Sequence, residues 1–184
     1  MKRNLLFIDA ESDGLYGPFL SVAIVAVNGD GEELERGYYG IAREKMQVSD
    51  PWVREHVVPL LGDYEPCENE QELLEKVWNF WFRYLESSWL VADVVYPVES
   101  RLFEQCVARN AGERMWLAPY PLLDLSSMLY AVGIDPTEER VKLAGDQSDA
   151  YSHNALWDVE LSVEIWKKYI RSKNGGEGNE LFKG

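Results

Sequence analysis

Near its amino terminus the chain carries the sequence Leu5-Leu6-Phe7-Ile8-Asp9-Ala10-Glu11-Ser12-Asp13-Gly14-Leu15. The four leading apolar residues predict a buried β-strand. Side chains alternate between the two faces of a strand, so Asp9 and Glu11 are expected to point the same way. Burying two like charges without a partner costs several kcal/mol. Mg²⁺ or Mn²⁺, which prefer carboxylate oxygens, would compensate them; the alternative is a solvated acidic turn after the strand.

Length and composition predict one globular domain. The chain has 184 residues, of which 46% are hydrophobic, enough to build a sizeable core. We expect this domain to cover residues 1–171. Residues 172–184 are rich in glycine and charge and are expected to form a flexible C-terminal tail.

The chain shows no sign of a membrane or secreted protein. It has no run of about 18 apolar residues, and its first four residues lead directly into the predicted strand. The two cysteines, Cys67 and Cys106, are too few for a disulfide framework and lack metal-ligand spacing. A reducing, cytoplasmic location is therefore expected.

The strong negative charge restricts the class of nucleic acid that the chain could bind. Its 18 basic and 32 acidic residues give a net charge of −14. This argues against sequence-independent binding of long duplex DNA, which depends on neutralising phosphates. A single-stranded or short DNA or RNA substrate requires fewer phosphate contacts, and metal ions could supply the positive charge locally.

The order of predicted elements indicates an α/β fold. Three strands come first, and the Asn28-Gly29-Asp30-Gly31 sequence between the second and third predicts a hairpin turn. Helices and strands then alternate to the end of the chain. The result is a mixed five-stranded sheet, a three-strand antiparallel meander plus parallel strands, flanked by helices. The predicted strands cover residues 4–10, 20–27, 34–41, 89–93 and 122–125, and the main helices cover residues 70–86, 97–110 and 155–170.

Three further polar residues follow at positions where an acidic first strand would need partners. Glu99 lies in the first turn of the helix after the strand at residues 89–93. Asp158 lies near the start of the last helix, and His153 precedes it by five residues. Strand ends and helix starts meet at one rim of an α/β sheet, so we expect these side chains to converge there.

The chain resembles the DEDDh 3′–5′ exonuclease family, the RNase H-like group that includes proofreading subunits, RNase T and oligoribonuclease. The first motif of that family, Asp-x-Glu-Thr-Thr-Gly-Leu, is similar to residues 9–15 here. Its third motif, His-x4-Asp at the start of the last helix, matches His153 and Asp158 in spacing and setting. The order and lengths of the elements agree from about residue 4 to 170, most of the chain.

The second motif departs from the family. There an Asp opens the helix that follows a strand, whereas this chain has Glu99 at that place and Asp93 at the preceding strand end. We favour Glu99 as the metal ligand and keep Asp93 as the alternative. Outside a metal site, Glu99 would be a helix N-terminal carboxylate and Asp93 a capping residue.

The resemblance implies two Mg²⁺ or Mn²⁺ ions about 3.5–4 Å apart, which stabilise the attacking and leaving oxygens of a phosphodiester. Asp9 would bridge the ions, and Glu11, Glu99 and Asp158 would complete their shells. His153 would take the proton from the attacking water.

The remaining polar and apolar residues near these motifs are less informative. His56 has no motif around it and is interpreted as structural. Leu15 and Tyr16 follow the first motif and could contact the terminal base, although a packing role fits them equally well.

Several readings remain open at this level. The first is a metal-dependent 3′–5′ exonuclease. The second keeps the fold but acts on very short oligonucleotides, which suits an acidic protein. The third is a catalytically silent RNase H-like module that binds a partner. Neither the choice between DNA and RNA nor the oligomeric state, a homodimer included, follows from the residues.

Overall fold

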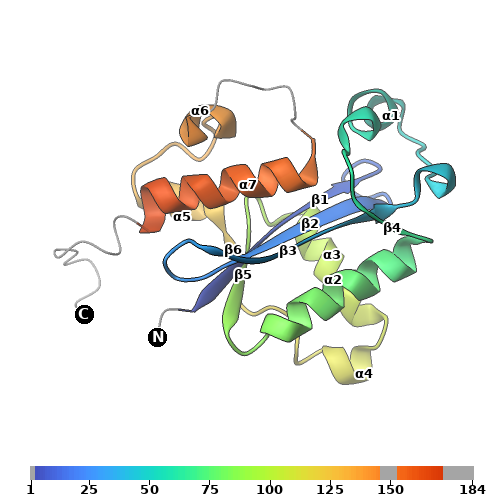
Figure 1. The fold of residues 1–184 in the computed structure, drawn as a ribbon, viewed down its shortest axis with the longest axis horizontal. Coiled ribbons are helices and arrows are strands. Elements are labelled where there is room, and N and C mark those ends of the chain that lie inside the picture. Colours follow the sequence, from blue (N-terminus) through green and yellow to red (C-terminus); the bar gives the residue numbers. More distant parts are fainter. Residues whose placement is uncertain (1–2, 146–152, 172–184) are drawn as a thin grey trace.

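A computed structural model describes residues 3–145 and 153–171. A six-stranded mixed sheet runs through the middle of the molecule, with helices on both faces (Figure 1). The order of strands across the sheet is β4-β3-β2-β1-β5-β6. The strands are β1 (Asn4–Ser12), β2 (Phe19–Val27), β3 (Glu33–Ile41), β4 (Glu65–Cys67), β5 (Ser88–Ala92) and β6 (Leu122–Asp124).

The predicted α/β architecture with its antiparallel meander is confirmed. β1 pairs antiparallel with β2, and β2 pairs antiparallel with β3. On its other side β1 pairs parallel with β5, which in turn pairs parallel with β6. The strand β1 therefore lies where the antiparallel and parallel halves of the sheet meet.

The predicted number of five strands is wrong, because the sheet has a sixth strand. β4 has three residues and pairs parallel with the end of β3, from Tyr39 to Ile41. A strand this short has no readable alternation of polar and apolar residues. It also contains Pro66, which a sheet accepts at an edge, where one side of the strand needs no backbone donor.

Two groups of helices cover the faces of the sheet (Figure 1). On one face, α2 (Glu70–Tyr84) and α3 (Val98–Ala108) pack against a core that includes Leu6, Ile8 and Ala10 of β1, and α4 (Ala111–Arg114) follows α3. On the other face, α7 (Ala155–Ile165) packs against a core that includes Leu5 and Phe7. The helices α5 (Leu125–Ala131) and α6 (Arg140–Ala144) lie on that same side.

A smaller unit, α1 (Pro51–His56), lies at the end of the sheet where β1 finishes (Figure 1). It sits between two single 3₁₀ turns, Arg43–Lys45 and Val58–Leu60. Its buried residues form a separate apolar cluster of Leu20, Val53, Val57 and Leu61. The segment around α1 therefore packs against β2 through its own small apolar cluster.

Side-chain caps explain where α1, α2 and α7 begin. Asn69, Asp50 and Asn154 each accept backbone N–H groups in the first turn of α2, α1 and α7, respectively. Such caps satisfy N–H groups that have no partner within the helix. The last helix was expected to reach residue 170; its α-helical part ends at Ile165 and a π-helical turn, Trp166–Arg171, continues it.

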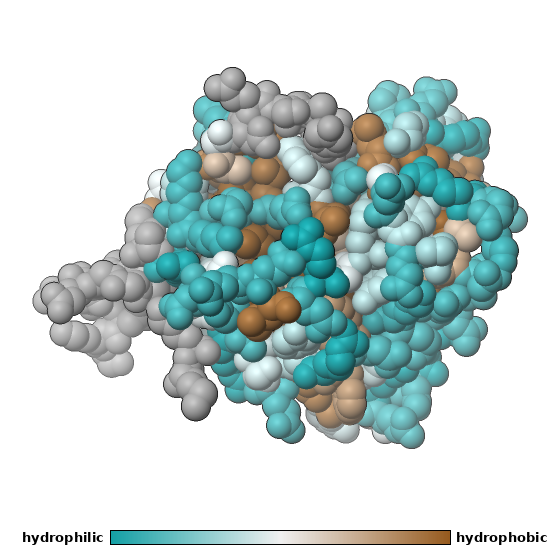
Figure 2. Space-filling model, in the orientation of Figure 1, coloured by the Kyte–Doolittle hydropathy of each residue, from teal (hydrophilic) through white to brown (hydrophobic). Residues whose placement is uncertain are grey.

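The surface agrees with the charge of the chain. The face shown in Figure 2 is mostly hydrophilic, with hydrophobic side chains in small separate patches. Within the described residues, none of the helices has the length and apolar character needed to cross a bilayer. Cys67 and Cys106 are both buried free thiols. The tail expected at residues 172–184 lies outside the described residues.

Candidate active site

The first strand extends past its parallel neighbour, and this creates the opening for a site. β5 pairs with β1 only as far as Ile8 and Ala92. β1 continues for four more residues and remains paired with β2, with Asp9 opposite Ala23 and Glu11 opposite Ser21. The two acidic residues therefore lie beside the gap that β5 leaves, at the place where the two halves of the sheet meet. Ligand sites of open α/β sheets form at such points.

Alternation along β1 directs both carboxylates to the same face of the sheet. Because Leu5 and Phe7 pack on the α7 side, Asp9 and Glu11 also point to that side. Asp158, in the first turn of α7, meets them there. One carboxylate oxygen from each of the three residues lies within 4.8 Å of the others.

Glu99 approaches the same place from the opposite face of the sheet. It lies in the first turn of α3 and is buried, with 6% of its surface exposed. Its carboxylate accepts hydrogen bonds from its own backbone N–H and from that of Ala10, which lies beyond the part of β1 that pairs with β5. The Glu99 carboxylate therefore lies near Ala10, the residue of β1 between Asp9 and Glu11.

Burial and mutual repulsion raise the pKa values of these carboxyls. Loss of solvent is the largest cause for each of them. The charges of Asp158 and Glu99 add to it at Glu11, whose pKa is raised to about 8. The pKa of Glu99 is raised to about 7, with Asp93 contributing. Burial raises the pKa of Asp9 well above its usual range, and the charges of Glu11, Glu99 and Asp158 raise it further.

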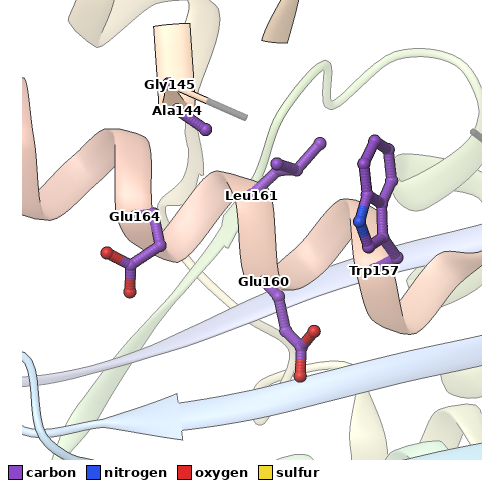
Figure 3. Close-up of a pocket in the computed structure, with 6 residues that line it drawn as sticks. All are labelled: Ala144, Gly145, Trp157, Glu160, Leu161 and Glu164. Carbon is purple, nitrogen blue, oxygen red and sulfur yellow. The ribbon is translucent and has the colours of Figure 1, made fainter. Parts of the chain in front are cut away.

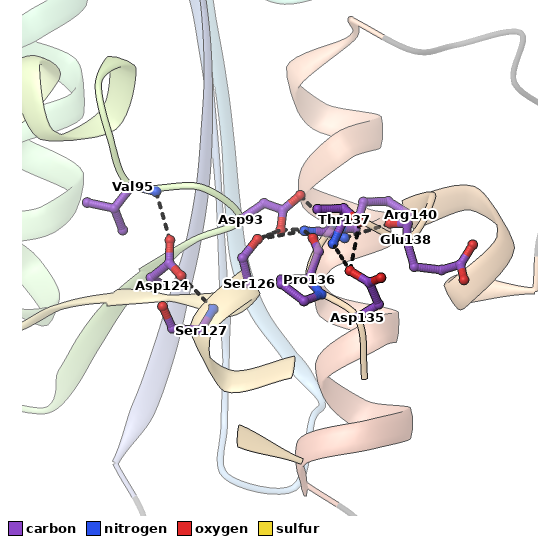
Figure 4. A network of polar contacts seen from close by, with 10 residues as sticks. All are labelled: Asp93, Val95, Asp124, Ser126, Ser127, Asp135, Pro136, Thr137, Glu138 and Arg140. Carbon is purple, nitrogen blue, oxygen red and sulfur yellow. Dashed lines mark hydrogen bonds and ion pairs between the residues drawn. The ribbon is translucent and has the colours of Figure 1, made fainter. Parts of the chain in front are cut away.

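Asp93 differs from these carboxylates because its side chain already forms an ion pair with a basic residue, Arg140. Both of its carboxylate oxygens accept hydrogen bonds from Nε of Arg140, at 2.8 and 2.7 Å (Figure 4). The same guanidinium donates to the hydroxyl of Ser126 at 2.6 Å and to the backbone carbonyls of Pro136 and Glu138. The Asp93 carboxylate lines the pocket but is part of a complete ion-pair network.

The acidic residues lie in a pocket of about 310 Å³. Leu15, Tyr96 and His153 form part of its wall together with the carboxylates. Tyr16 lies beside this wall, with its hydroxyl oxygen 3.3 Å from that of Tyr96. Tyr16 and Tyr96 are 69% and 70% exposed, so the mouth of the pocket carries accessible aromatic rings.

The rings of both histidines contact one tryptophan, Trp52. His153 is exposed and lines the pocket just before α7. Its ring meets Trp52 of α1 edge to face, with centroids 5.3 Å apart and planes at 86°. His56 stacks on the same indole at 5.0 Å, and its Nδ1 lies 2.9 Å from the carbonyl oxygen of Trp52. His56 does not line the described pocket wall.

A second pocket is also lined by acidic residues, but these form ion pairs with basic side chains of the protein. It lies between the end of α6 and α7 and is lined by Ala144, Gly145, Trp157, Glu160, Leu161 and Glu164 (Figure 3). Glu160 binds Arg36 at 2.8 Å, and Glu164 binds Lys167 at 2.7 Å. These carboxylates are compensated within the protein and require no further cation.

The donor set of the first pocket fits divalent metal ions. Among the described residues, no basic side chain lies within 4.0 Å of Asp9, Glu11 or Glu99. The cluster offers carboxylate oxygens only, which are the ligands that hard ions such as Mg²⁺ and Mn²⁺ prefer. A cation in this cluster would remove the repulsion that raises the pKa values.

In its fold the chain is similar to exonuclease I. The zinc-bound structure of the E. coli exonuclease I–ssDNA complex matches with a TM-score of 0.68 and 14% identity, covering 94% of this chain and 41% of that chain. For exonuclease I from Methylocaldum szegediense the TM-score is 0.65 at 14% identity, covering 90% of this chain and 40% of that one. E. coli exonuclease I in complex with a dA16 oligonucleotide gives 0.64 and 15%, with 90% and 40% covered.

These likenesses show the fold, which is RNase H-like as predicted. The chain spans about two fifths of the length of the exonucleases that it matches. At the level of sequence, no family model and no curated protein matches the chain.

Some neighbours of the site did not emerge from the sequence. Arg140 is 47 residues from Asp93, and no motif connects them. Trp52 is about 100 residues from His153 in the sequence, and no motif connects the two, although their rings are in contact. Tyr96 is the residue that the sequence could have indicated, because it lies two residues before the helix that carries Glu99.

Proposed function

We propose that the chain is a divalent-metal-dependent 3′–5′ exonuclease that acts on single-stranded or short nucleic acid. The observation that carries the proposal is the cluster of Asp9, Glu11 and Asp158, whose carboxylate oxygens lie within 4.8 Å of one another. Glu99 adds a buried fourth carboxylate from the opposite face of the sheet. The fold shared with exonuclease I, whose E. coli member has been crystallised with single-stranded DNA, also supports it.

In this proposal Asp9, Glu11, Glu99 and Asp158 would hold two divalent ions, Mg²⁺ or Mn²⁺. When bound, such ions stabilise negative charge on the attacking and leaving oxygens of a phosphodiester. We assign this role to Glu99 and not to Asp93, because both Asp93 oxygens already accept hydrogen bonds from Arg140. The remaining residues then have to bind the strand and accept a proton.

His153 is proposed to accept the proton of the attacking water. It is exposed and lines the pocket with the carboxylates, so that its ring can reach a water molecule there. The unperturbed pKa of a histidine lies close to neutrality, which suits a proton acceptor.

The rim of the pocket is proposed to bind the terminal nucleotides. Leu15, Tyr16 and Tyr96 present accessible apolar and aromatic surface at its mouth. Stacking on aromatic side chains contributes about 1–3 kcal/mol per base and does not depend on base identity. With a net charge of −14, the chain depends on such contacts more than on basic residues.

The test uses short DNA and RNA strands labelled at either end, incubated with Mg²⁺ or Mn²⁺. We expect nucleotides to be released from the 3′ end, and Asp9→Asn to abolish this release while the fold is kept. Release from the 5′ end, or full activity of folded Asp9→Asn, would contradict the proposal.

Two other outcomes of the same experiment point to the remaining readings. Hydrolysis restricted to strands of a few nucleotides would indicate a short-oligonucleotide phosphodiesterase. Metal binding in calorimetry without hydrolysis of any strand would indicate a silent binding module.

A further inference from the structure

The segment that carries α1 is connected to two parts of the active site. Its start is connected to the loop that follows β1, and its end to the residue that caps α7. Between these connections, Trp52 contacts His153. The chain thus has a direct structural connection between the loop after the metal-binding strand and the candidate proton acceptor.

The first connection is Asp13, two residues after Glu11. Its buried carboxylate accepts hydrogen bonds from the backbone N–H of Ser49 at 2.7 Å, the hydroxyl of Ser49 at 2.6 Å and the N–H of Asp50 at 2.9 Å. Asp50 in turn caps α1 by accepting the N–H of Trp52 at 2.8 Å. The start of α1, including Trp52, is therefore held in place by the loop that begins at the end of β1.

The second connection is Asn154, which follows His153 directly. Its amide donates to the carbonyl of Leu60 at 2.9 Å, and its side-chain oxygen accepts the N–H of Trp157 at the start of α7. Gly62 has a φ of +66°, and a Cβ there would lie 2.6 Å from the Asn154 amide nitrogen. Only glycine allows this close approach at that backbone angle.

His153 itself has an uncommon backbone conformation. Its φ is 71°, in the left-handed region that non-glycine residues seldom occupy. Such conformations persist where the surrounding structure holds them. The His153 ring contacts the ring of Trp52, whose centroid is 5.3 Å away in an edge-to-face arrangement. This distance and angle are those of a favourable aromatic pair.

We infer that Trp52 is a positioning residue that holds the His153 ring over the carboxylate pocket, with Asp13 and Asn154 keeping α1 in register. This inference rests on the proposed function of His153 as proton acceptor. Trp52 does not line the described pocket wall, so its effect on hydrolysis passes through His153.

The first test detects the contact between the Trp52 and His153 rings and does not depend on nuclease activity. The chain has two histidines, and both rings contact Trp52, so an NMR spectrum of the histidine ring protons has two sets of signals. The His56→Gln variant identifies the His153 set. Trp52→Leu, which keeps bulk but removes the ring current, should move the His153 signals, whereas Trp116→Leu should not, since Trp116 is 86% exposed in the loop before β6. Unmoved His153 signals in Trp52→Leu would overturn the inference.

The second test asks whether Trp52 acts through His153. Misplacement of a reacting group by about 1 Å costs up to about 10²-fold in rate. We expect Trp52→Leu to lower kcat by about 10-fold with little change in KM, and Trp52→Phe to recover most of it. In a His153→Ala background, Trp52→Leu should cause less than about a 2-fold further loss, since groups that act together are not additive.

The two tests distinguish failure of the positioning role of Trp52 from failure of the proposed function. A full additional loss of kcat in the His153→Ala background, or a change in KM alone, would overturn the positioning role, and the latter would indicate contact with the substrate. Absence of hydrolysis in the unmodified protein would refute the proposed function, while the NMR result would still decide whether Trp52 sets the His153 ring. If Trp52→Leu does not fold, Trp52→Met, which also removes the ring, takes its place in both tests.

Discussion

Asp93 and Glu99 line the same pocket six residues apart, yet their surroundings are opposite. Asp93 is paired with Arg140 through both carboxylate oxygens and remains partly open to solvent. Glu99 is buried beside Asp9 with no basic side chain within 4.0 Å among the described residues, and its pKa is raised to about 7. Asp93 thus has an ion-pair partner within the protein, whereas the charge that acts to lower the pKa of Glu99 is the more distant one of Arg101.

This difference separates two uses of negative charge. A charge paired during folding stabilises the structure, and removal of its partner leaves an unsatisfied group. A charge left unpaired in a partly buried cluster makes the metal-free protein less stable, and under the proposed function it would hold a divalent ion. The predictions below vary the two carboxylates in parallel.

The largest expected effect is on hydrolysis. Glu99→Gln keeps the size of the side chain but removes the charge proposed to bind a metal ion, so we expect turnover to fall by at least about 10²-fold. Asp93→Asn should lower it by less than about 10-fold. Nuclease assays, with calorimetric titration of Mn²⁺ in parallel, provide the measurement. A Mn²⁺-soaked crystal with an ion on Asp93 and with Glu99 turned to solvent would reverse the assignment.

A smaller loss is expected when Glu99 keeps its charge but loses one methylene. The backbone of α3 and its hydrogen bond from Ala10 place the longer side chain beside Asp9. Glu99→Asp should therefore lower turnover by about 10-fold, equivalent to about 1.4 kcal/mol in transition-state stabilisation. Steady-state kinetics over a range of metal concentrations check it. Activity equal to that of the unmodified protein would show that the site tolerates either length.

The thermal stability of the metal-free protein should change in opposite directions. Glu99→Gln removes a repelled, buried charge and should raise the melting temperature. Asp93→Asn breaks the pair with Arg140 and should lower the free energy of unfolding by about 1–3 kcal/mol. Calorimetric melts in EDTA at pH 8 measure both. Equal shifts of the same sign would mean that the two carboxylates are not electrostatically different.

The smallest effect is a pH dependence of stability that metal removes. The pKa values of Glu11 and Glu99 are raised in the folded state, from 4.5 to about 8 and about 7. These groups therefore contribute stability below about pH 4.5 that is lost as pH rises through 7 to 8. The pKa of Asp13 is lowered, so its contribution is lost only on acidification.

The melting temperature of the metal-free protein should accordingly fall between pH 5 and pH 8, and Glu99→Gln should reduce this slope, whereas Asp93→Asn should leave it in place. Saturating Mn²⁺ at pH 8 should restore the loss. A melting temperature that rises over this interval in EDTA would contradict the raised pKa values.

Much of the fold followed from local patterns in the chain. The antiparallel meander came from three apolar runs and the turn sequence at residues 28–31, and β1, β2 and β3 confirm it. The helices at residues 70–86 and 97–110 came from apolar spacing and from Pro97. The three-residue strand β4 was missed because it is too short to show a period and contains Pro66.

The convergence of the candidate site was also predictable in part. Asp9 and Glu11 alternate on one strand, so their shared face is a property of the sequence. That Asp158 would reach them depended on expecting helix starts and strand ends at one rim, and the three carboxylates do lie together. The roles of these residues, and those of Glu99 and His153, stay predictions.

What the sequence determined by itself was the set of local features: alternation, periodicity, turns and caps, each set by residues a few positions apart. What only the tertiary structure decided was which charges are compensated. Asp93 and Arg140, like Trp52 and His153, are brought together by packing of elements far apart in the chain. Because electrostatic and aromatic interactions depend on distances between side chains, residues that look alike along the sequence can differ completely in the folded protein.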